Sequence, residues 1–252
     1  MTDELSKDQK SVDPEEVARY TALASTWWDK AGPFWPLHRL NELRVGYLRE
    51  TLCRVFQRNM RESQPLTGLD MLDIGCGGGI LSEALATLGA TVHGIDVVDR
   101  NIAIARLHAE RSGLAIRYET VTAEALARQG VHYDAVLNME VVEHVADLEG
   151  FVHACCQLVK PGGLMFIATI NRTLLSWLTA IVGAEYVLCW LPRGTHRWRR
   201  FPSPRELAEL LARDGLRIIA RTGVRVNPFT RRMFLTGYLG VNYMLVAEKT
   251  KP

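Results

Sequence analysis

The sequence predicts an α/β protein with a seven-stranded, mostly parallel sheet and helices on both faces. From residue 70 onward, short apolar runs alternate with amphipathic helical stretches, the pattern of repeated βαβ units. The first run ends in a glycine-rich turn, as expected where a sheet binds a cofactor. A chain of 252 residues can also bury a sufficient core without metal or disulfide support. One large domain is therefore expected.

The composition limits the function classes. Hydrophobic residues make up 48% of the chain and charged residues 23%, which is typical of a soluble globular protein. A formal net charge of +2 argues against nucleic acid as a partner of the whole chain. The five cysteines include no C-x-x-C pair, and the polar, acidic start of the chain lacks the features of a secretory signal. We expect a reduced, cytoplasmic protein.

The N-terminal quarter differs from the rest. Residues 1–13 are charged, carry no apolar period and are expected to form a disordered tail. Residues 14–60 are predicted to form a helical cover that starts at Asp13-Pro14, where a capping side chain precedes a first-turn proline. The main domain is then expected at 68–252, with an insertion at 171–202.

Seven strands are expected within the main domain. Gly113 ends a helix that starts at Asp99, and Lys160-Pro161-Gly162-Gly163 indicates a turn before the fifth strand. The last two strands follow a helix with a capping box at Ser203-Pro204-Arg205-Glu206. The expected strands are 70–74, 91–95, 115–119, 133–138, 164–169, 216–225 and 241–247.

The glycine-rich turn reads DIGCGGG from Asp73 to Gly79. A dinucleotide fingerprint needs glycine or alanine at position 80, where this chain has Ile80, so a dehydrogenase is the minority interpretation. An acid just before the glycines instead favours a cofactor with a cationic amino-acid tail. Asp96 ends the second expected strand, 21 residues after Gly75, where an acid can accept both hydroxyls of a ribose. A helix cap is the alternative role for Asp96.

These features, with NMEVVEH and KPGG, resemble the class I S-adenosylmethionine-dependent methyltransferases. WWDKAGPFWPLHRLNELRVGY, RLHAERSG, INR, SWLTAIVGAEY, GTH and VNYML resemble more narrowly the ubiquinone biosynthesis O-methyltransferase family, over roughly residues 14–247. The resemblance implies a Rossmann-like fold, S-adenosylmethionine as methyl donor, and polyprenylated phenols as substrates. The methylated intermediates would be 2-polyprenyl-6-hydroxyphenol and 3-demethylubiquinol. It also implies peripheral association with the inner membrane and with other quinone-biosynthesis proteins.

The resemblance further assigns cofactor contacts. The matching residues are Arg44, Gly75, Gly77, Asp96 and Met139. A guanidinium at position 44 can hold the methionine carboxylate through two hydrogen bonds, although an exposed helical arginine is the alternative. Met139 either packs on the adenosyl group or presents its backbone, unless it only fills the core.

Glu140, Glu143 and His144 follow the fourth expected strand with i, i+3 and i+4 spacing, so a helix starting there would place them on one face. Eukaryotic relatives are regarded as needing a divalent cation at the matching residues. Carboxylates suit magnesium, while an imidazole fits zinc, iron or manganese better. Two alternatives stay open. His144 is a catalytic base for a phenol whose pKa is about 10, or Glu143 and His144 only order the loop.

An apolar stretch, residues 174–191, lies in the expected insertion and carries one charge, Glu185. The basic residues that follow it alternate with aromatic ones, and they are Arg193, Arg197, Arg199 and Arg200. This combination predicts contact with an anionic membrane lipid surface, or a buried lid over the substrate pocket, or both. The rival functions are methylation of another small acceptor and a non-catalytic lipid-binding scaffold. Retention of the glycine turn and of E-x-x-E-H disfavours the scaffold.

Overall fold

A mixed sheet forms the centre of the protein in a computed structural model that describes residues 15, 26–32, 34–173, 201–227, 230 and 232–251. Eight strands make up this sheet over the described residues. They are β1 (Asp70–Ile74), β2 (Thr91–Asp96), β3 (Arg117–Thr120), β4 (Tyr133–Met139), β5 (Val159–Ile170), β6 (Leu216–Val226), β7 (Met233–Thr236) and β8 (Asn242–Lys249).

The strand order is β3-β2-β1-β4-β5-β8-β6-β7. Strands β1 to β5 pair in parallel, β8 is antiparallel to both β5 and β6, and β7 is antiparallel to β6. Six strands therefore share one direction, and their carboxyl ends lie at the same edge of the sheet. The predicted α/β fold with a mostly parallel sheet is confirmed.

The predicted number of seven strands is wrong because of β7. This four-residue strand pairs with the end of β6, with Arg225 opposite Phe234 and Val226 opposite Met233. Four residues are too few to show a clear alternation of apolar and polar side chains, so the strand depends on its partner rather than on a local pattern.

The segment Lys160–Gly163 lies inside β5, not in a turn before it. Tyr133 on β4 is opposite Val159, but Ala135 is already opposite Leu164, so β5 bulges opposite a single residue of β4. Gly162 takes a left-handed backbone conformation with φ +76° within this bulge. The ammonium of Lys160 lies 3.0 Å from the carboxylates of both Asp70 and Asp134, which ties the bulge to β1 and β4.

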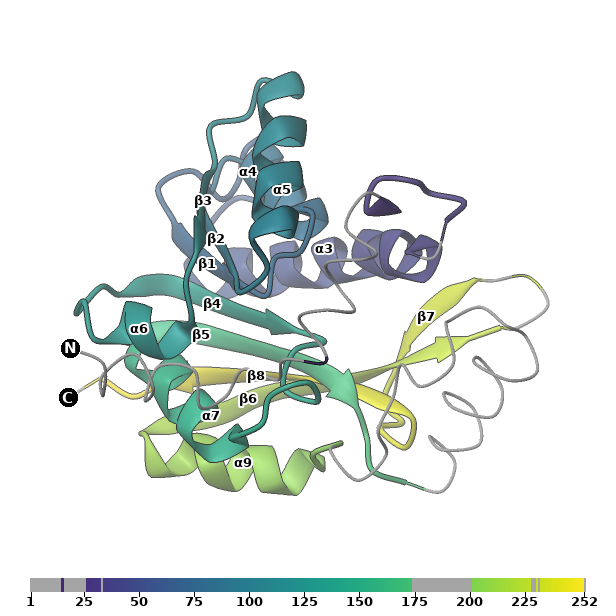
Figure 1. The fold of residues 1–252 in the computed structure, drawn as a ribbon. Helices are drawn as coiled ribbons and strands as arrows, with labels where there is room; N and C mark the ends of the chain where they lie inside the picture. Colours follow the sequence, from purple (N-terminus) through teal and green to yellow (C-terminus); the bar gives the residue numbers. More distant parts are fainter. Residues whose placement is uncertain are drawn as a thin grey trace.

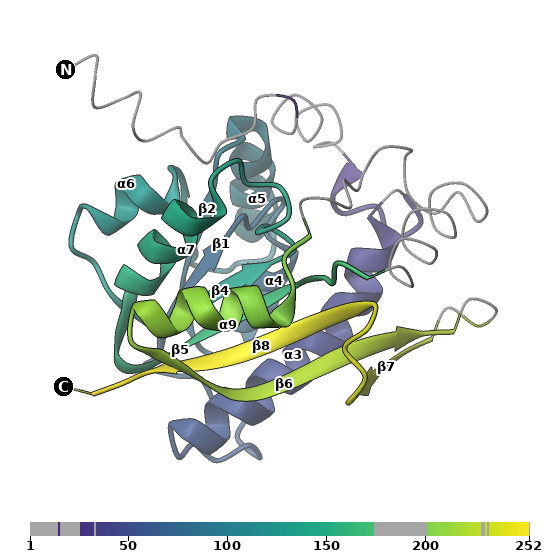
Figure 2. The ribbon, with the colours of Figure 1, turned by 90° about the horizontal axis from the view of Figure 1, so that it is seen from below.

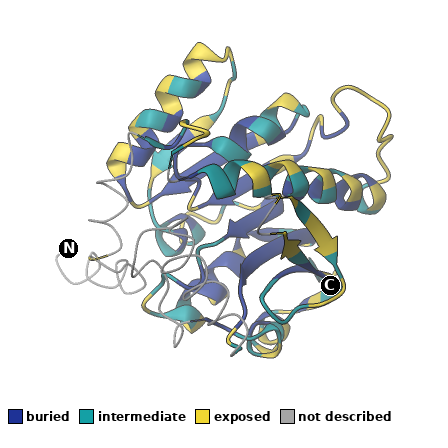
Figure 3. Ribbon diagram, turned by 90° about the vertical axis from the view of Figure 1, so that its right-hand side faces the viewer, coloured by how far each residue is buried: buried dark blue, intermediate teal, exposed yellow. Residues whose placement is uncertain are grey.

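Helices cover both faces of the sheet (Figures 1 and 2). One face carries α3 (Trp35–Val55), α4 (Ile80–Thr87) and α5 (Asp99–Arg111), and the other carries α6 (Ala123–Ala127), α7 (Leu148–Gln157) and α9 (Pro204–Arg213). A separate apolar core fills each interface, and the buried residues gather along the sheet (Figure 3). The capping box that starts α9 is present, with the Ser203 side chain accepting from the Glu206 amide and Glu206 from the Ser203 amide.

The predicted helical cover is only partly described. Its described helix, α3, begins at Trp35 with a proline in the first turn and ends at Val55 rather than near residue 60. Leu48 and Leu52 of α3 are fully buried in the same core as strand residues, so this helix shares its core with the sheet. The N-terminal tail, the apolar stretch 174–191 and the four arginines after it lie outside the described residues. Within the described part of the chain, no helix has the length and apolar character needed to cross a bilayer.

Candidate active site

The glycine turn between β1 and α4 is closely packed against its surroundings. Gly75, Gly77 and Gly79 all have positive φ, at +68°, +54° and +86°. A Cβ added to Gly75 would lie 2.5 Å from a methyl carbon of Val141, and one added to Gly79 would lie 2.3 Å from the Tyr118 hydroxyl. Both the left-handed backbone and the lack of space therefore require glycine here.

Asp96 is held rigidly beside this turn, at the carboxyl end of β2. One carboxylate oxygen accepts a hydrogen bond of 2.9 Å from the Gly77 amide, and the other accepts one of 2.8 Å from the Val98 amide. Burial raises the pKa of Asp96, while these backbone hydrogen bonds oppose the rise. Asn101 on α5 also reaches this carboxylate, at 3.4 Å. The structure thus brings together the predicted ribose acid and the predicted glycine turn.

Asp73 lies at the end of β1 and is almost completely buried. Its carboxylate accepts a hydrogen bond of 2.6 Å from the hydroxyl of Ser82 on α4. Burial raises the pKa of Asp73 to about 7, against the opposing effects of this hydrogen bond and of the Arg44 charge. A cationic ligand above the turn would therefore be bound beside a carboxyl group that ionises near neutral pH.

Two tryptophans from the segment before α3 pack on the glycine turn, a contact that the sequence did not reveal. Trp27 donates a hydrogen bond of 2.8 Å to the side-chain oxygen of Asn101 and stacks on Phe34 with ring centroids 3.9 Å apart. A Cβ at either Gly77 or Gly78 would lie 2.5 Å from the Trp27 side chain. This tryptophan therefore covers the turn closely.

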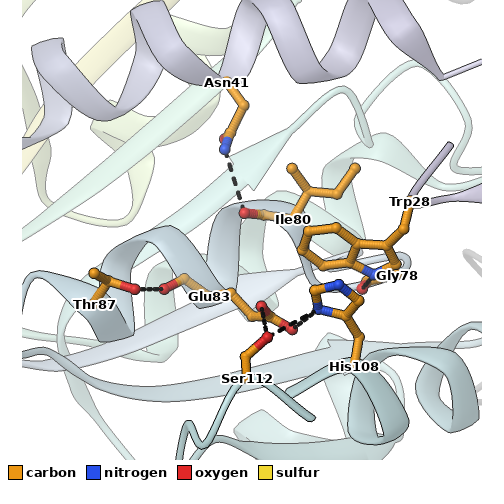
Figure 4. A network of polar contacts seen from close by, with 8 residues as sticks. All are labelled: Trp28, Asn41, Gly78, Ile80, Glu83, Thr87, His108 and Ser112. Atoms are coloured by element: carbon orange, nitrogen blue, oxygen red, sulfur yellow. Dashed lines mark hydrogen bonds and ion pairs between the residues drawn. The ribbon is translucent and has the colours of Figure 1, made fainter. Parts of the chain in front are cut away.

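Trp28 fixes the outer side of the same turn (Figure 4). Its indole nitrogen donates a hydrogen bond of 2.9 Å to the carbonyl of Gly78, and its ring stacks flat on His108 of α5 at 3.4 Å. His108 in turn lies 2.7 Å from the carboxylate of Glu83 on α4, which also accepts from Ser112. The chain segment before α3 is thus joined to both helices that flank the turn. The concentration of aromatic residues between positions 27 and 35 was the available signal.

Arg44 projects from α3 to the end of β4, where it forms an ion pair with Glu140. The arginine side chain is buried, so the alternative of an exposed helical arginine is wrong. Glu140 follows Met139, the buried last residue of β4, and has φ +59°, a left-handed conformation that is costly for a residue with a Cβ. Arg44, Met139 and Glu140 therefore lie together at the carboxyl edge of the sheet.

The expectation that a helix starts within MEVVEH is wrong. Residues 142–144 form a turn, and α7 begins only at Leu148, where the Asp147 side chain caps it by accepting from the Gly150 amide at 3.1 Å. Glu140, Glu143 and His144 consequently do not share a helix face. His144 is placed in the turn by a hydrogen bond of 2.8 Å from its amide to the Val141 carbonyl.

These three side chains do not fit the metal site that the resemblance implied. Glu140 is paired with Arg44, and the buried carboxyl of Glu143 accepts a hydrogen bond of 2.7 Å from the Thr169 hydroxyl. Burial, and then the charge of Glu140, raise the pKa of Glu143 well above its usual range, so this group favours its neutral form. Over the described ranges, no three histidine, cysteine or acidic side chains gather in an arrangement that could hold a metal ion. The predicted divalent cation such as magnesium is therefore not supported.

Comparisons with known proteins agree with this geometry. Residues 44–221 match a family described as "Methyltransferase domain". The chain is 52% identical over 239 residues to the ubiquinone biosynthesis O-methyltransferase of Methylobacterium nodulans, covering 95% of this chain and 96% of that protein. It is 50% identical over 246 residues to the protein of that name from Rhizobium rhizogenes, and the match covers 97% of this chain and 99% of that protein.

Solved structures support the fold. Magnesium protoporphyrin IX methyltransferase from Synechocystis PCC 6803, with bound SAH, superposes with a TM-score of 0.61 at 21% identity and covers 85% of this chain and 84% of that one. An S-adenosylmethionine-dependent methyltransferase from Clostridium acetobutylicum superposes with a TM-score of 0.59 at 13% identity. The superposition covers 82% of this chain and 90% of that one. At these identities the likeness extends to the fold alone.

Proposed function

The chain belongs to the ubiquinone biosynthesis O-methyltransferase family, and we propose that it methylates a phenolic oxygen of polyprenylated catechol-type intermediates, with S-adenosylmethionine as methyl donor. The two acceptors are 2-polyprenyl-6-hydroxyphenol and 3-demethylubiquinol. The observation that carries the proposal is the Asp96 carboxylate, fixed by the Gly77 and Val98 amides beside a turn that accommodates no side chain.

The residues of the site fit the parts of the donor. Asp96 would accept hydrogen bonds from the ribose hydroxyls through the lone pairs that the backbone amides leave free. The backbone of Gly75 and Gly77 would lie against the amino-acid part. Arg44 would bind the carboxylate of the donor through the guanidinium N–H groups that its ion pair with Glu140 leaves available. Met139 would contact the adenosyl group. When bound, the donor supplies an electrophilic methyl group on a positively charged sulfur.

The protein must also help the acceptor to ionise. A phenol with a pKa of about 10 is mostly protonated at neutral pH, and its oxygen becomes nucleophilic once a base removes the proton. We assign this role to His144, which the turn after β4 places at the carboxyl edge of the sheet. The oxygen then bonds to the methyl carbon as the carbon–sulfur bond breaks, and the imidazolium releases its proton to solvent. Alignment of the reacting atoms would supply much of the acceleration, up to about 7 to 11 kcal/mol.

The acceptors also suggest where the enzyme works. A polyprenyl tail dissolves in the bilayer, so we propose a cytoplasmic protein that is peripherally associated with the inner membrane and with other quinone-biosynthesis proteins. The apolar stretch 174–191 and the arginines after it support this proposal at the level of sequence.

The direct test is transfer of a labelled methyl group. The protein is incubated with S-adenosylmethionine labelled in its methyl group and with a short-tailed, water-soluble catechol. We expect label in a methyl ether of the catechol, and transfer only to non-phenolic acceptors would contradict the proposal.

A further inference from the structure

The side chain of Asn101 joins the candidate donor site to the segment before α3. Asn101 lies in the first turn of α5 and is 2% exposed. Its amide nitrogen lies 3.4 Å from the Asp96 carboxylate, and its amide oxygen accepts a hydrogen bond of 2.8 Å from the indole nitrogen of Trp27. A buried chain of contacts therefore leads from Trp27 through Asn101 to the proposed ribose acid.

The chemistry of the two neighbours defines which way the Asn101 amide points. An indole N–H can only donate a hydrogen bond, and an ionised carboxylate can only accept one. The amide oxygen must therefore face Trp27, and the amide nitrogen must face Asp96. A flipped amide would place its oxygen against the carboxylate and its NH2 group against the indole N–H. Both contacts would be repulsive, and in a buried site such contacts are costly.

Trp27 is itself held in place by contacts that do not involve Asn101. Its ring stacks on Phe34 with an interplanar angle of 4°. Its backbone carbonyl lies 2.9 Å from Nε2 of His38 on α3. The residue is buried, with 7% of its surface exposed. The position of the indole nitrogen is therefore fixed independently, and this nitrogen can orient the amide of Asn101.

The same indole lies against a second group that binds Asp96. The Gly77 amide donates a hydrogen bond of 2.9 Å to this carboxylate, and a Cβ on Gly77 would lie 2.5 Å from the Trp27 ring. Trp27 thus contacts two groups that donate to Asp96. It meets the Gly77 backbone by packing and the Asn101 side chain through a hydrogen bond. Its place in the structure therefore bears directly on the geometry of the ribose acid.

We propose that Trp27 and Asn101 are positioning residues for recognition of the donor's ribose. Trp27 orients the Asn101 amide, the amide nitrogen holds one carboxylate oxygen of Asp96, and the carboxylate is thereby aimed at the two ribose hydroxyls. The segment before α3 thus takes part in donor binding. The inference rests on the proposed function, because it deepens the ribose role assigned there to Asp96. The alternative is that Trp27 and Asn101 only stabilise the glycine turn.

Binding of two ligands to the full-length protein separates these roles. One ligand is S-adenosylhomocysteine, which keeps the ribose of the donor and is not consumed. The other is its 2′,3′-dideoxy analogue, which lacks both ribose hydroxyls. Calorimetry gives a Kd for each, and the ratio of the dideoxy Kd to the parent Kd measures ribose recognition. A variant that only loosens the turn weakens both ligands by the same factor and leaves this ratio unchanged.

The test variant is Trp27→Phe, which keeps an aromatic ring against Gly77 but removes the indole N–H. The matched control is Trp28→Phe, which removes an indole N–H from the neighbouring residue on the same turn, where it donates to the Gly78 carbonyl (Figure 4). We expect Trp27→Phe to lower the ratio about two- to tenfold, the range for loss of one neutral hydrogen bond. Trp28→Phe should weaken both ligands equally and keep the wild-type ratio.

A double variant tests the order of the contacts. Asn101→Ala should lower the ratio at least as far as Trp27→Phe does. Adding Trp27→Phe to Asn101→Ala should lower it no further, because Trp27 acts through Asn101.

Three results would overturn the inference while the ribose role of Asp96 stands. They are a wild-type ratio in Trp27→Phe, an equal fall of the ratio in Trp28→Phe, and a further fall when Trp27→Phe is added to Asn101→Ala. Equal affinity of the wild type for the two ligands would remove the ribose role of Asp96, and the inference with it. Methyl transfer to the catechol decides the proposed function separately.

Discussion

Replacing Asp73 with asparagine is expected to stabilise the protein increasingly as pH rises. Burial raises the pKa of this carboxyl from 3.8 to about 7 in the folded protein. In the unfolded chain the same group ionises near its ordinary pKa of about 4. The folded state therefore keeps a proton that the unfolded state has already lost, and the free energy of unfolding of the wild type falls as pH rises between about 4 and about 7. An asparagine has no proton to lose.

The structure sets the size of this effect. A pKa difference of about three units corresponds to about 4 kcal/mol at high pH. The side-chain carbonyl of the introduced asparagine can still accept the hydrogen bond from Ser82, whose length is 2.6 Å in the wild type. We expect the stabilisation of Asp73→Asn relative to the wild type to grow by about 2 to 3 kcal/mol between about pH 5 and about pH 8.

Urea unfolding at several pH values measures this difference. Asp70→Asn is the matched control, because Asp70 lies on the same strand with its side chain 52% exposed. Its effect should stay within about 1 kcal/mol at every pH. A stabilisation by Asp73→Asn that does not change with pH would refute the assignment of a raised pKa to this carboxyl.

Three further substitutions test the site. Asp96→Ala should weaken S-adenosylmethionine binding, measured by calorimetry, by about 1.5 to 3 kcal/mol, and an unchanged Kd would exclude the ribose role. His144→Ala should lower kcat far more than it weakens donor binding, while a chelator should leave wild-type turnover intact; normal turnover of the variant would remove His144 as the base. Gly77→Ala should destabilise the fold more than Gly113→Ala in urea unfolding, because both glycines have positive φ but only the Cβ at position 77 would meet Trp27. Equal losses would show that backbone conformation alone matters there.

The pairing of Asp96 with the glycine turn could be predicted because it follows from sheet geometry. Strands β1 and β2 are parallel neighbours, so their carboxyl ends meet at one edge, and the turn and the acid each lie at the end of one of them. Two residues that each follow or end one of these strands, such as Gly75 and Asp96, are therefore close in space although they are 21 residues apart in the sequence. The same logic places Met139 at the end of β4, which is the neighbour of β1 on its other side.

The segment after β4 could not be derived in this way. The spacing of Glu140, Glu143 and His144 suits a helix, but helical spacing is only a necessary condition. Asp147 provides the cap that starts α7, and the chain before it turns with Glu140 in a left-handed conformation. The sequence signal for the start of α7 is therefore the capping residue Asp147 and not the spacing of the three preceding side chains.

The contacts of Trp27 and Trp28 could not be derived either. Both residues fall within the predicted helical cover, but in the structure they lie in a turn before α3. Their partners Asn101 and His108 are far along the chain, on α5. Only the packing of the segment before α3 against the glycine turn brings them together. The aromatic density of the segment indicated burial without indicating the partner.

The charge of the candidate site is consistent with the proposed ligand, S-adenosylmethionine. Asp73, Asp96 and Glu143 are buried acids whose pKa values are raised by burial, and Arg44 is already paired with Glu140. Ionised carboxylates at such depth are costly unless a positive charge lies nearby. A donor with a positively charged sulfur and a cationic amino group provides that charge, and its carboxylate offers Arg44 a partner. Once the methyl group has left, the sulfur is neutral and this attraction is weaker. If Asp73 and Asp96 line the donor site as proposed, they would therefore bind the charged donor more tightly than its neutral demethylated product.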